Sequence, residues 1–305
     1  MPARMTSDLS GRRVLITGAA RGIGAATAQR LHERGARVVL AGIEPDVLAR
    51  TAAKCGDALA VVCDVRDREQ VEAAVEAAAE HLRGLDVVVA NAGVAAQLPL
   101  IGGDPEVFER TIDVNLLGVY YTLRAAGPHI AHERGYALAI ASLAAAVHLP
   151  LLGAYSASKA GVEALANTLR IELAPSGARV GVAYFAELDT DMVRQGFGTA
   201  AAKRGAEIRR PVARVSPLGV GIDAIERGIA RRSARVWAPR WVGPLLYLRG
   251  LLQPLTERQA LREMAALRES VETAETSGET ERLDPVLGVA AEALQEHPRA
   301  ATPLG

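Results

Sequence analysis

The sequence contains few aromatic residues and few cysteines, and its charges cancel. Phe, Trp and Tyr make up 4% of the chain, and 35 Lys and Arg residues balance 35 Asp and Glu residues. A chain without excess positive charge lacks the electrostatic footprint of a nucleic-acid-binding protein. Two cysteines, Cys55 and Cys63, make no disulfide framework, so we expect a reducing, cytoplasmic location with both thiols as small core residues.

Long hydrophobic runs are missing as well. No window of 18 residues is both apolar and uncharged, and the N-terminal stretch lacks the apolar segment of a signal peptide. We therefore expect no membrane-spanning helix. No metal site is predicted either. Half of the residues are apolar, which is ordinary for a globular protein.

From residue 13 the chain alternates short apolar runs with helical patterns. In runs such as "RVLITG" and "ARVVLAG" apolar residues occupy successive positions, which indicates strands buried on both faces. Six such strands are predicted, at 13–18, 36–42, 58–65, 85–93, 136–142 and 179–185. Their alternation with helices predicts an α/β fold, a doubly wound parallel sheet (Rossmann fold), over residues 11–237. A C-terminal helical extension is predicted over 238–305.

A glycine-rich loop, "TGAARGIG", joins the first predicted strand to the first predicted helix. Gly18, Gly22 and Gly24 permit a tight turn and a close approach of the backbone to a pyrophosphate. The free N–H groups at the start of the following helix favour an anion at the same place. The position of the loop between strand and helix supports a dinucleotide site over a simple turn.

This loop, "CDV" at residues 63–65, "NAG" at residues 91–93 and "YSASK" at residues 155–159 resemble the short-chain dehydrogenase/reductase family over about residues 11–237. The resemblance implies binding of NAD(H) or NADP(H) and assembly as a homodimer or homotetramer. The cofactor-binding residues that it implies are Gly18, Arg21, Gly22, Ile23, Gly24, Asp64, Val65, Asn91, Ala92, Gly93, Tyr155, Lys159, Leu188 and Thr190.

Tyr155 and Lys159 are four residues apart, so they share one face of a helix. A nearby ammonium lowers the pKa of a phenol, and the charge of an oxidised nicotinamide adds to this effect. We therefore predict that Tyr155 exchanges a proton with an alcohol or ketone near neutral pH. The resemblance implies two further catalytic residues, Ser142 to hold the substrate oxygen and Asn115 to anchor a water beside the lysine.

The choice between NADP(H) and NAD(H) depends on the end of the second strand. Gly42 stands where NAD-binding relatives carry an aspartate, and Arg21 is placed to meet a 2′-phosphate, so NADP(H) is slightly favoured. Ile43 stands where many NADP-binding relatives carry a second arginine. Glu44 is a displaced acid within reach of a ribose, and a solvated loop charge is the alternative role for Arg21.

The pattern departs from the family after the sixth strand, where Phe185 and Ala186 replace a usual Pro-Gly. Phe185 is either a core aromatic or part of the pocket wall. Apolar residues are predicted near the catalytic group: Ala144, Ala145, Val147, Leu149, Leu151 and Leu152. They favour a lipophilic alcohol or carbonyl substrate. A covering loop can still bring positive charge from Arg194, Lys203, Arg204, Arg209 or Arg210.

The apolar tail from Trp237 to Leu255 has three possible roles: packing on the domain, a lid over the pocket, or contact with a membrane surface. We favour packing over membrane contact. The whole pattern predicts an NAD(P)-dependent oxidoreductase that interconverts a secondary alcohol and a ketone, or an alcohol and an aldehyde. The alternatives are a non-catalytic dinucleotide sensor or scaffold and an epimerase or dehydratase on the same fold.

Overall fold

The computed structural model describes residues 9–98, 100–194 and 215–276. Its centre is a seven-stranded parallel sheet with the strand order β3-β2-β1-β4-β5-β6-β7. The strands are β1 (Arg13–Thr17), β2 (Arg37–Gly42), β3 (Ala60–Val62), β4 (Val87–Ala90), β5 (Tyr136–Ile140), β6 (Arg179–Phe185) and β7 (Arg235–Ala238). The predicted doubly wound α/β fold is confirmed.

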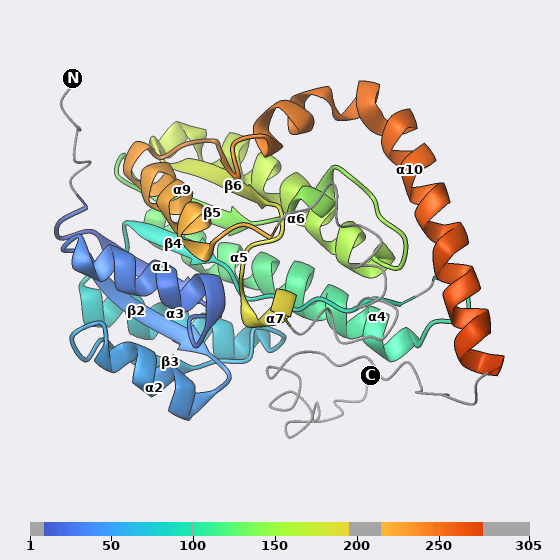
Figure 1. The fold of residues 1–305 in the computed structure, drawn as a ribbon. Helices are drawn as coiled ribbons and strands as arrows, with labels where there is room; N and C mark the ends of the chain where they lie inside the picture. The colour runs from blue at the N-terminus through green and yellow to red at the C-terminus, as the bar shows by residue number, and fades with distance from the viewer. Residues whose placement is uncertain (1–8, 99, 195–214, 277–305) are drawn as a thin grey trace, which may run out of the picture.

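Helices cover both faces of this sheet (Figure 1). On one face lie α1 (Gly22–Glu33), α2 (Pro45–Ala53) and α9 (Leu218–Arg231). On the other lie α3 (Arg68–Leu82), α4 (Pro105–Ile112), α5 (Gly118–Ile130) and α6 (Gly153–Glu172). Successive strand residues enter opposite layers, since Val14 and Ile16 pack with the first set and Leu15 with the second. This burial on both faces explains why the strands read as continuous apolar runs.

The order of the strands reverses direction at β1. The chain goes from β1 outward to β2 and β3, and then returns to place β4 on the other side of β1. At such a switch point the loops that follow the neighbouring strands diverge and leave a crevice for a ligand. The loops after β1, β4 and β5 carry the predicted motifs, so the fold brings these motifs to one edge of the sheet.

Two helices with a break between them follow the loop after β4. A π-helical turn, Asp113–Leu117, separates α4 from α5, and α5 begins at Gly118. A Cβ atom at Gly118 would lie 2.7 Å from the side chain of Val65, so a glycine is needed where α5 meets the loop after β3. The π-helical turn therefore ends directly before this glycine.

The seventh strand was not among the six predicted strands. β7 ends one residue after position 237, where the sequence places the end of the α/β domain. It forms the edge strand of the sheet next to β6. Its four residues, Arg235–Ala238, merge in sequence with the tryptophans and prolines of the tail, so no apolar run marks the strand. The helix α9, which precedes β7, was not named from the sequence either.

The C-terminal extension is helical over its described part, α10 (Val242–Thr276). Pro254 lies inside the helix, where it removes one backbone donor and disturbs the preceding turn. Figure 1 shows α10 running past the end of α6 and then changing direction along the side of the domain. No helix in the described part of the chain has an apolar stretch long enough to cross a bilayer.

Candidate active site

A cavity of about 340 Å³ lies at the carboxyl ends of the strands. The glycine loop after β1 forms one end, and residues of β5 and α6 form the other. The predicted site residues that line it are Gly18, Arg21, Gly22, Ile23, Asp64, Val65, Asn91, Ala92, Gly93, Ser142, Tyr155, Lys159, Leu188 and Thr190. Gly24 and Asn115 lie behind this lining and support it.

The glycine loop forms a cradle that side chains would fill. Gly18 and Gly22 have φ values of +63° and +57°, in the left-handed region that favours glycine. A Cβ atom at Gly24 would lie 2.2 Å from the carbonyl oxygen of Gly18. At Gly22 the nearest atom would be 4.0 Å away, on Thr190, so the loop is open toward the cavity there. This cradle at the start of α1 fits a dinucleotide pyrophosphate.

Asn91 ties the end of β4 to the glycine loop. Its side-chain amide donates to the carbonyl oxygens of Thr17 (2.9 Å) and Gly18 (3.1 Å). The hydroxyl of Thr17 accepts from the backbone N–H groups of Asn91 (3.1 Å) and Ala92 (3.3 Å). Asn91 therefore positions the cradle through hydrogen bonds within the chain. Thr17 was missed from the sequence, although it directly precedes the first glycine of the loop.

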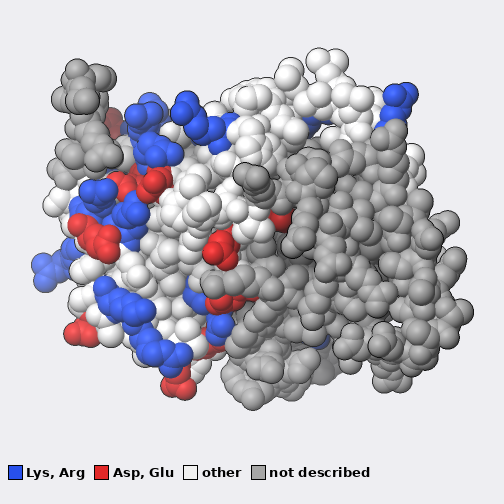
Figure 2. Space-filling model, in the orientation of Figure 1, with Lys and Arg blue, Asp and Glu red and all other residues white. Residues whose placement is uncertain are grey.

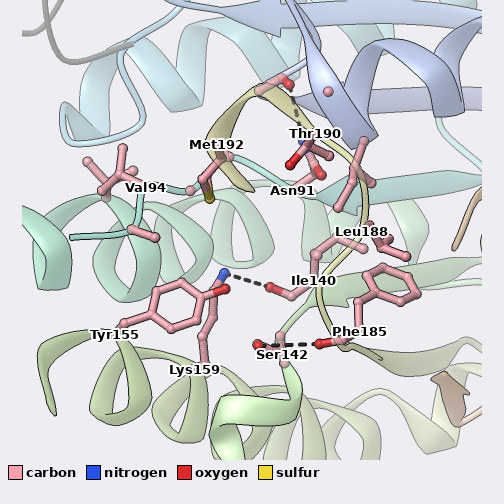
Figure 3. Close-up of a pocket in the computed structure, with 18 of the residues that line it drawn as sticks. Asn91, Val94, Ile140, Ser142, Tyr155, Lys159, Phe185, Leu188, Thr190 and Met192 are labelled. Atoms are coloured by element: carbon pink, nitrogen blue, oxygen red, sulfur yellow. Dashed lines mark hydrogen bonds between the residues drawn. The ribbon is translucent and has the colours of Figure 1, made fainter. Parts of the chain in front are cut away.

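Lys159 is buried at the other end of the cavity, with 3% of its surface exposed. Its ammonium donates to the carbonyl oxygen of Ile140 (2.9 Å) at the end of β5. The same nitrogen lies 5.7 Å from the centre of the Tyr155 ring. Figure 3 shows both side chains reaching from α6 into the same space. Burial lowers the pKa of Lys159 to about 8, because the low-polarity surroundings disfavour its charge.

The pKa of Tyr155 differs from the expectation drawn from the sequence. Burial raises this pKa, and a hydrogen bond with the Ser142 hydroxyl acts in the opposite direction. The spacing of Tyr155 and Lys159 indicates that an ammonium is near, but it says nothing about how much water the fold removes. In the chain alone, the loss of water outweighs the hydrogen bond, so the phenol is protonated at neutral pH.

Ser142 follows β5 and is held from two sides. Its hydroxyl oxygen accepts from the backbone N–H of Ala144 (3.1 Å), and the hydroxyl lies 3.4 Å from the carbonyl oxygen of Phe185. Phe185 is buried in the layer under α9 and also lines the cavity (Figure 3). Both roles considered for this aromatic residue therefore apply, and its backbone carbonyl orients the serine.

Asn115 lies in the π-helical turn and is fully buried. Its side chain accepts from the backbone N–H of Val94 (2.7 Å) and donates to the carbonyl oxygen of the same residue (2.8 Å). It also donates to the Ser158 hydroxyl (3.1 Å). A Cβ atom at Gly93 would lie 3.1 Å from the Asn115 amide oxygen and 3.4 Å from the Lys159 nitrogen. Asn115 thus braces the loop after β4 beside Lys159.

The end of the cavity next to β2 contains ion pairs. The guanidinium of Arg21 bonds the carboxylate of Glu44 through Nε (2.7 Å) and through a second nitrogen. Asp64 in turn bonds Arg66, with 2.9 Å between Nε and a carboxylate oxygen. Arg21 is therefore not the solvated loop charge considered as an alternative, because it has a carboxylate partner. The sequence named Arg21 and Glu44 separately, 23 residues apart, and missed their pairing.

The comparisons with known proteins agree with this geometry. The family model described as short chain dehydrogenase matches residues 12–201. The chain belongs to the short-chain dehydrogenase family. (-)-trans-Carveol dehydrogenase of Rhodococcus erythropolis is 36% identical over 206 residues, which cover 61% of this chain and 74% of that protein. A short-chain type dehydrogenase/reductase from Mycobacterium marinum has a crystal structure that matches with a TM-score of 0.69 and 28% identity, covering 76% of this chain and 95% of that one.

Another relative, glycine betaine reductase ATRR of Emericella nidulans, is 38% identical over 213 residues. The matched region covers 67% of this chain, and the chain spans 17% of the length of that reductase. As a short-chain dehydrogenase the protein is an oxidoreductase that acts on CH–OH groups, and members of the family use NAD(P).

The cavity wall of this short-chain dehydrogenase next to Ser142 and Tyr155 is apolar. Four of the six predicted wall residues line the cavity: Ala144, Val147, Leu149 and Leu152. Ala145 and Leu151 do not line it. Met192 and Trp241 also line the cavity, and Trp241 belongs to the apolar tail for which a lid over the pocket was one predicted role. The side chains of Arg194, Lys203, Arg204, Arg209 and Arg210 lie outside the described part of the protein.

Both cysteines are free and buried, as predicted. Cys63 lines the cavity, where burial raises the pKa of its thiol to about 12 and keeps it protonated. Within the described ranges, no group of three or more His, Cys, Asp or Glu residues is arranged to hold a metal ion.

Proposed function

We propose that this short-chain dehydrogenase interconverts a lipophilic secondary alcohol and its ketone, with Tyr155 as the acid and base. One observation supports this most directly. The hydroxyls of Tyr155 and Ser142 interact at one end of a cavity whose adjoining wall is apolar. A substrate oxygen held there meets two polar groups, while its hydrocarbon part meets Leu149, Leu152 and Trp241.

In this proposal the chain provides the proton and the orientation. Bound NAD(P), held at the cradle of Gly18 and Gly22 and along Leu188 and Thr190, would supply or accept the hydride. During reduction Tyr155 donates a proton to the carbonyl oxygen, and during oxidation it accepts the proton of the hydroxyl. The Ser142 hydroxyl donates a hydrogen bond to the same oxygen and fixes its position.

Lys159 restores the proton on Tyr155 in this scheme. A lysine whose pKa is about 8 exchanges its proton near neutral pH, unlike an exposed lysine. The hydrogen bond to Ile140 keeps the amine beside Tyr155 in both protonation states. Asn115, which packs close to the same amine behind Gly93, is the residue that we propose anchors a connecting water.

The proposed cofactor is NADP(H), with a slight preference over NAD(H). Gly42 places no carboxylate at the end of β2, and Arg21 lines the cavity there. Glu44 limits the preference for NADP(H). Its carboxylate is already hydrogen-bonded to the Arg21 guanidinium, and its negative charge repels a 2′-phosphate. An adenosine ribose without that phosphate can accept or donate a hydrogen bond at Glu44 instead.

The apolar wall supports a lipophilic substrate, and the similarity to a carveol dehydrogenase points in the same direction. Assembly as a homodimer or homotetramer, which the family resemblance implies, is part of the same proposal. The experiment below also distinguishes two other functions on the same fold: a dinucleotide sensor without turnover, and an epimerase or dehydratase.

A panel of cyclic and aliphatic alcohols and ketones tests the reaction. The absorbance of the reduced nicotinamide is followed with NADP(H) and with NAD(H), and cofactor binding is measured separately. We expect turnover of neutral secondary alcohols and ketones, and slower turnover of analogues that carry a carboxylate. Cofactor binding without turnover across the panel would identify a sensor, and product formation without net change in the nicotinamide would identify an epimerase or dehydratase.

A further inference from the structure

Helix α10 carries a line of exposed apolar side chains, Pro244, Leu248, Leu251 and Leu255, here called the α10 stripe. The spacing of four, three and four residues puts them on one side of the helix. Leu248, Leu251 and Leu255 expose 47%, 79% and 60% of their surfaces. Isolated exposed leucines are common, but a continuous line of them along one helix marks a contact surface.

The opposite side of α10 is already in contact with the domain. Arg249 bonds the buried carboxylate of Glu163 on α6 at 2.9 Å. Val242 is fully buried, and Leu252 is half-buried. Because these contacts fix the rotation of the helix, the α10 stripe faces away from the sheet.

Positive charge outnumbers negative charge around the α10 stripe. From Val236 to Arg258 the chain contains three arginines, Arg240, Arg249 and Arg258, and one acidic residue, Glu257. Arg249 is paired with Glu163, whereas Arg240 is exposed just before the helix and Arg258 is exposed just after the stripe, next to the exposed Glu257. In Figure 2 the surface over the first turns of α10, at the top, is mostly white with arginines and no acidic residue in view. Such a surface complements an anionic one.

The size of the α10 stripe separates two possible occupants. Its twelve residues span about 17 Å along the helix, and at roughly 100 Å² for each leucine-sized side chain its four side chains offer about 400 Å². A stable interface with a second copy of the chain buries about 800 Å² on each partner. A lipid surface has no such requirement, since it accepts a narrow apolar line flanked by arginines.

We propose that the α10 stripe docks on an anionic lipid surface, with the first half of α10 lying in the interface plane. Trp241 connects this surface to the active site, because it is 46% exposed immediately before the helix and also lines the cavity. Docking in this orientation brings the apolar wall of the cavity next to the lipid, from which a lipophilic substrate can enter.

Flotation of the full chain with lipid vesicles tests the proposal. We expect the protein to float with vesicles of phosphatidylcholine and phosphatidylserine, and less with phosphatidylcholine alone or at high salt. The double variant Leu248→Glu with Leu251→Glu should reduce the floating fraction about tenfold, because two carboxylates replace the apolar line. Ile171→Glu is the matched control, since Ile171 is 76% exposed on α6, away from the stripe, and should not change flotation.

Three results would overturn the proposal. The wild-type chain does not float with either vesicle, the double variant floats as well as the wild type, or sedimentation shows a dimer that the double substitution dissociates. Turnover of a small soluble substrate by the double variant shows that its fold is intact. A chain that floats but turns over no alcohol or ketone would instead overturn the proposed reaction and leave the lipid contact in place.

Discussion

The two ends of the cavity differ in how they hold a cationic side chain. Lys159 lines the end that we propose is catalytic, and Arg21 lines the end next to β2. Lys159 is buried and donates to a backbone carbonyl, which carries no net charge. Arg21 is partly exposed and bonds the carboxylate of Glu44. The first arrangement lowers the pKa of the lysine to about 8, whereas the second pairs the arginine with an opposite charge.

The two arrangements suit different tasks: the end with Lys159 suits proton transfer, and the end with the Arg21–Glu44 ion pair suits discrimination between cofactors. Burial shifts the pKa of Lys159 toward neutral pH, so this group can exchange a proton there. An ion pair keeps its charge and instead discriminates between ligands, because an incoming phosphate must displace the carboxylate. Substitutions at the catalytic end should therefore change rates and pH profiles, and substitutions at the β2 end should change cofactor preference.

The largest effect is expected for Tyr155→Phe. Removing the phenol hydroxyl leaves no proton donor or acceptor at the substrate oxygen, so kcat should fall about 1,000-fold. Cofactor affinity, measured by titration of the bound reduced nicotinamide, should stay within about twofold. Tyr121→Phe removes a hydroxyl on α5 outside the cavity lining and should leave kcat unchanged. A Tyr155→Phe enzyme with wild-type kcat would contradict the proposed role.

The next effect concerns stability, and its sign follows from the lowered pKa of Lys159. Below about pH 8 the lysine is charged in both the folded and the unfolded chain, so the folded state bears the full cost of burying the charge. As the pH rises from 8 toward 10.5, the folded state releases this proton first and gains stability relative to the unfolded state. Lys159→Met has no such charge at any pH.

Urea unfolding without cofactor measures this difference. The stability of the wild type relative to Lys159→Met should rise by about 2.5 kcal/mol between about pH 7 and about pH 10, at about 1.36 kcal/mol for each pKa unit. Lys54→Met, at an exposed position after α2, should show no comparable change. A difference between wild type and Lys159→Met that does not vary with pH would mean that the lysine is not desolvated in solution.

The same two ends show what the sequence could predict. The sheet followed from continuous apolar runs, and the residues proposed as catalytic were chosen from motifs, since both kinds of signal depend on local order along the chain. The direction of the Tyr155 pKa shift could not be predicted from the sequence, because it depends on how much water the packed layers remove. The pairing of Arg21 with Glu44 could not be predicted either, because it depends on how the loop after β1 meets the start of α2.

Two other features depend on contacts between distant segments. β7 has only four residues and receives its identity from pairing with β6, which no pattern within Arg235–Ala238 reveals. Trp241 reaches the cavity because β7, which runs parallel to β6, ends at the carboxyl edge of the sheet three residues before it. In both cases a contact between distant segments decides the structure.

A tenfold effect on cofactor preference is expected for Glu44→Gln. The substitution removes the carboxylate that holds Arg21 and repels a phosphate, so the ratio of kcat/KM for NADP to that for NAD should rise about tenfold. Asp46→Asn removes a charge at an exposed position two residues further and should leave this ratio unchanged. If Glu44→Gln lowered the ratio, the carboxylate would be shown to hold a ligand group specific to NADP, against the proposed repulsion.

The smallest effect is expected for Trp241→Ala, which tests whether the apolar wall affects substrate binding without affecting cofactor binding. Trp241→Ala shortens the apolar wall without touching Tyr155, Ser142 or the β2 end, so KM for a bulky lipophilic substrate should rise about threefold to fivefold. The KM for the cofactor should not change, and Trp241→Phe should restore most of the substrate affinity because it keeps the apolar surface. Leu251→Ala, on the helix that follows Trp241 but outside the cavity lining, is the control. An equal rise in KM for cofactor and substrate would show that α10 affects the whole cavity rather than its catalytic end alone.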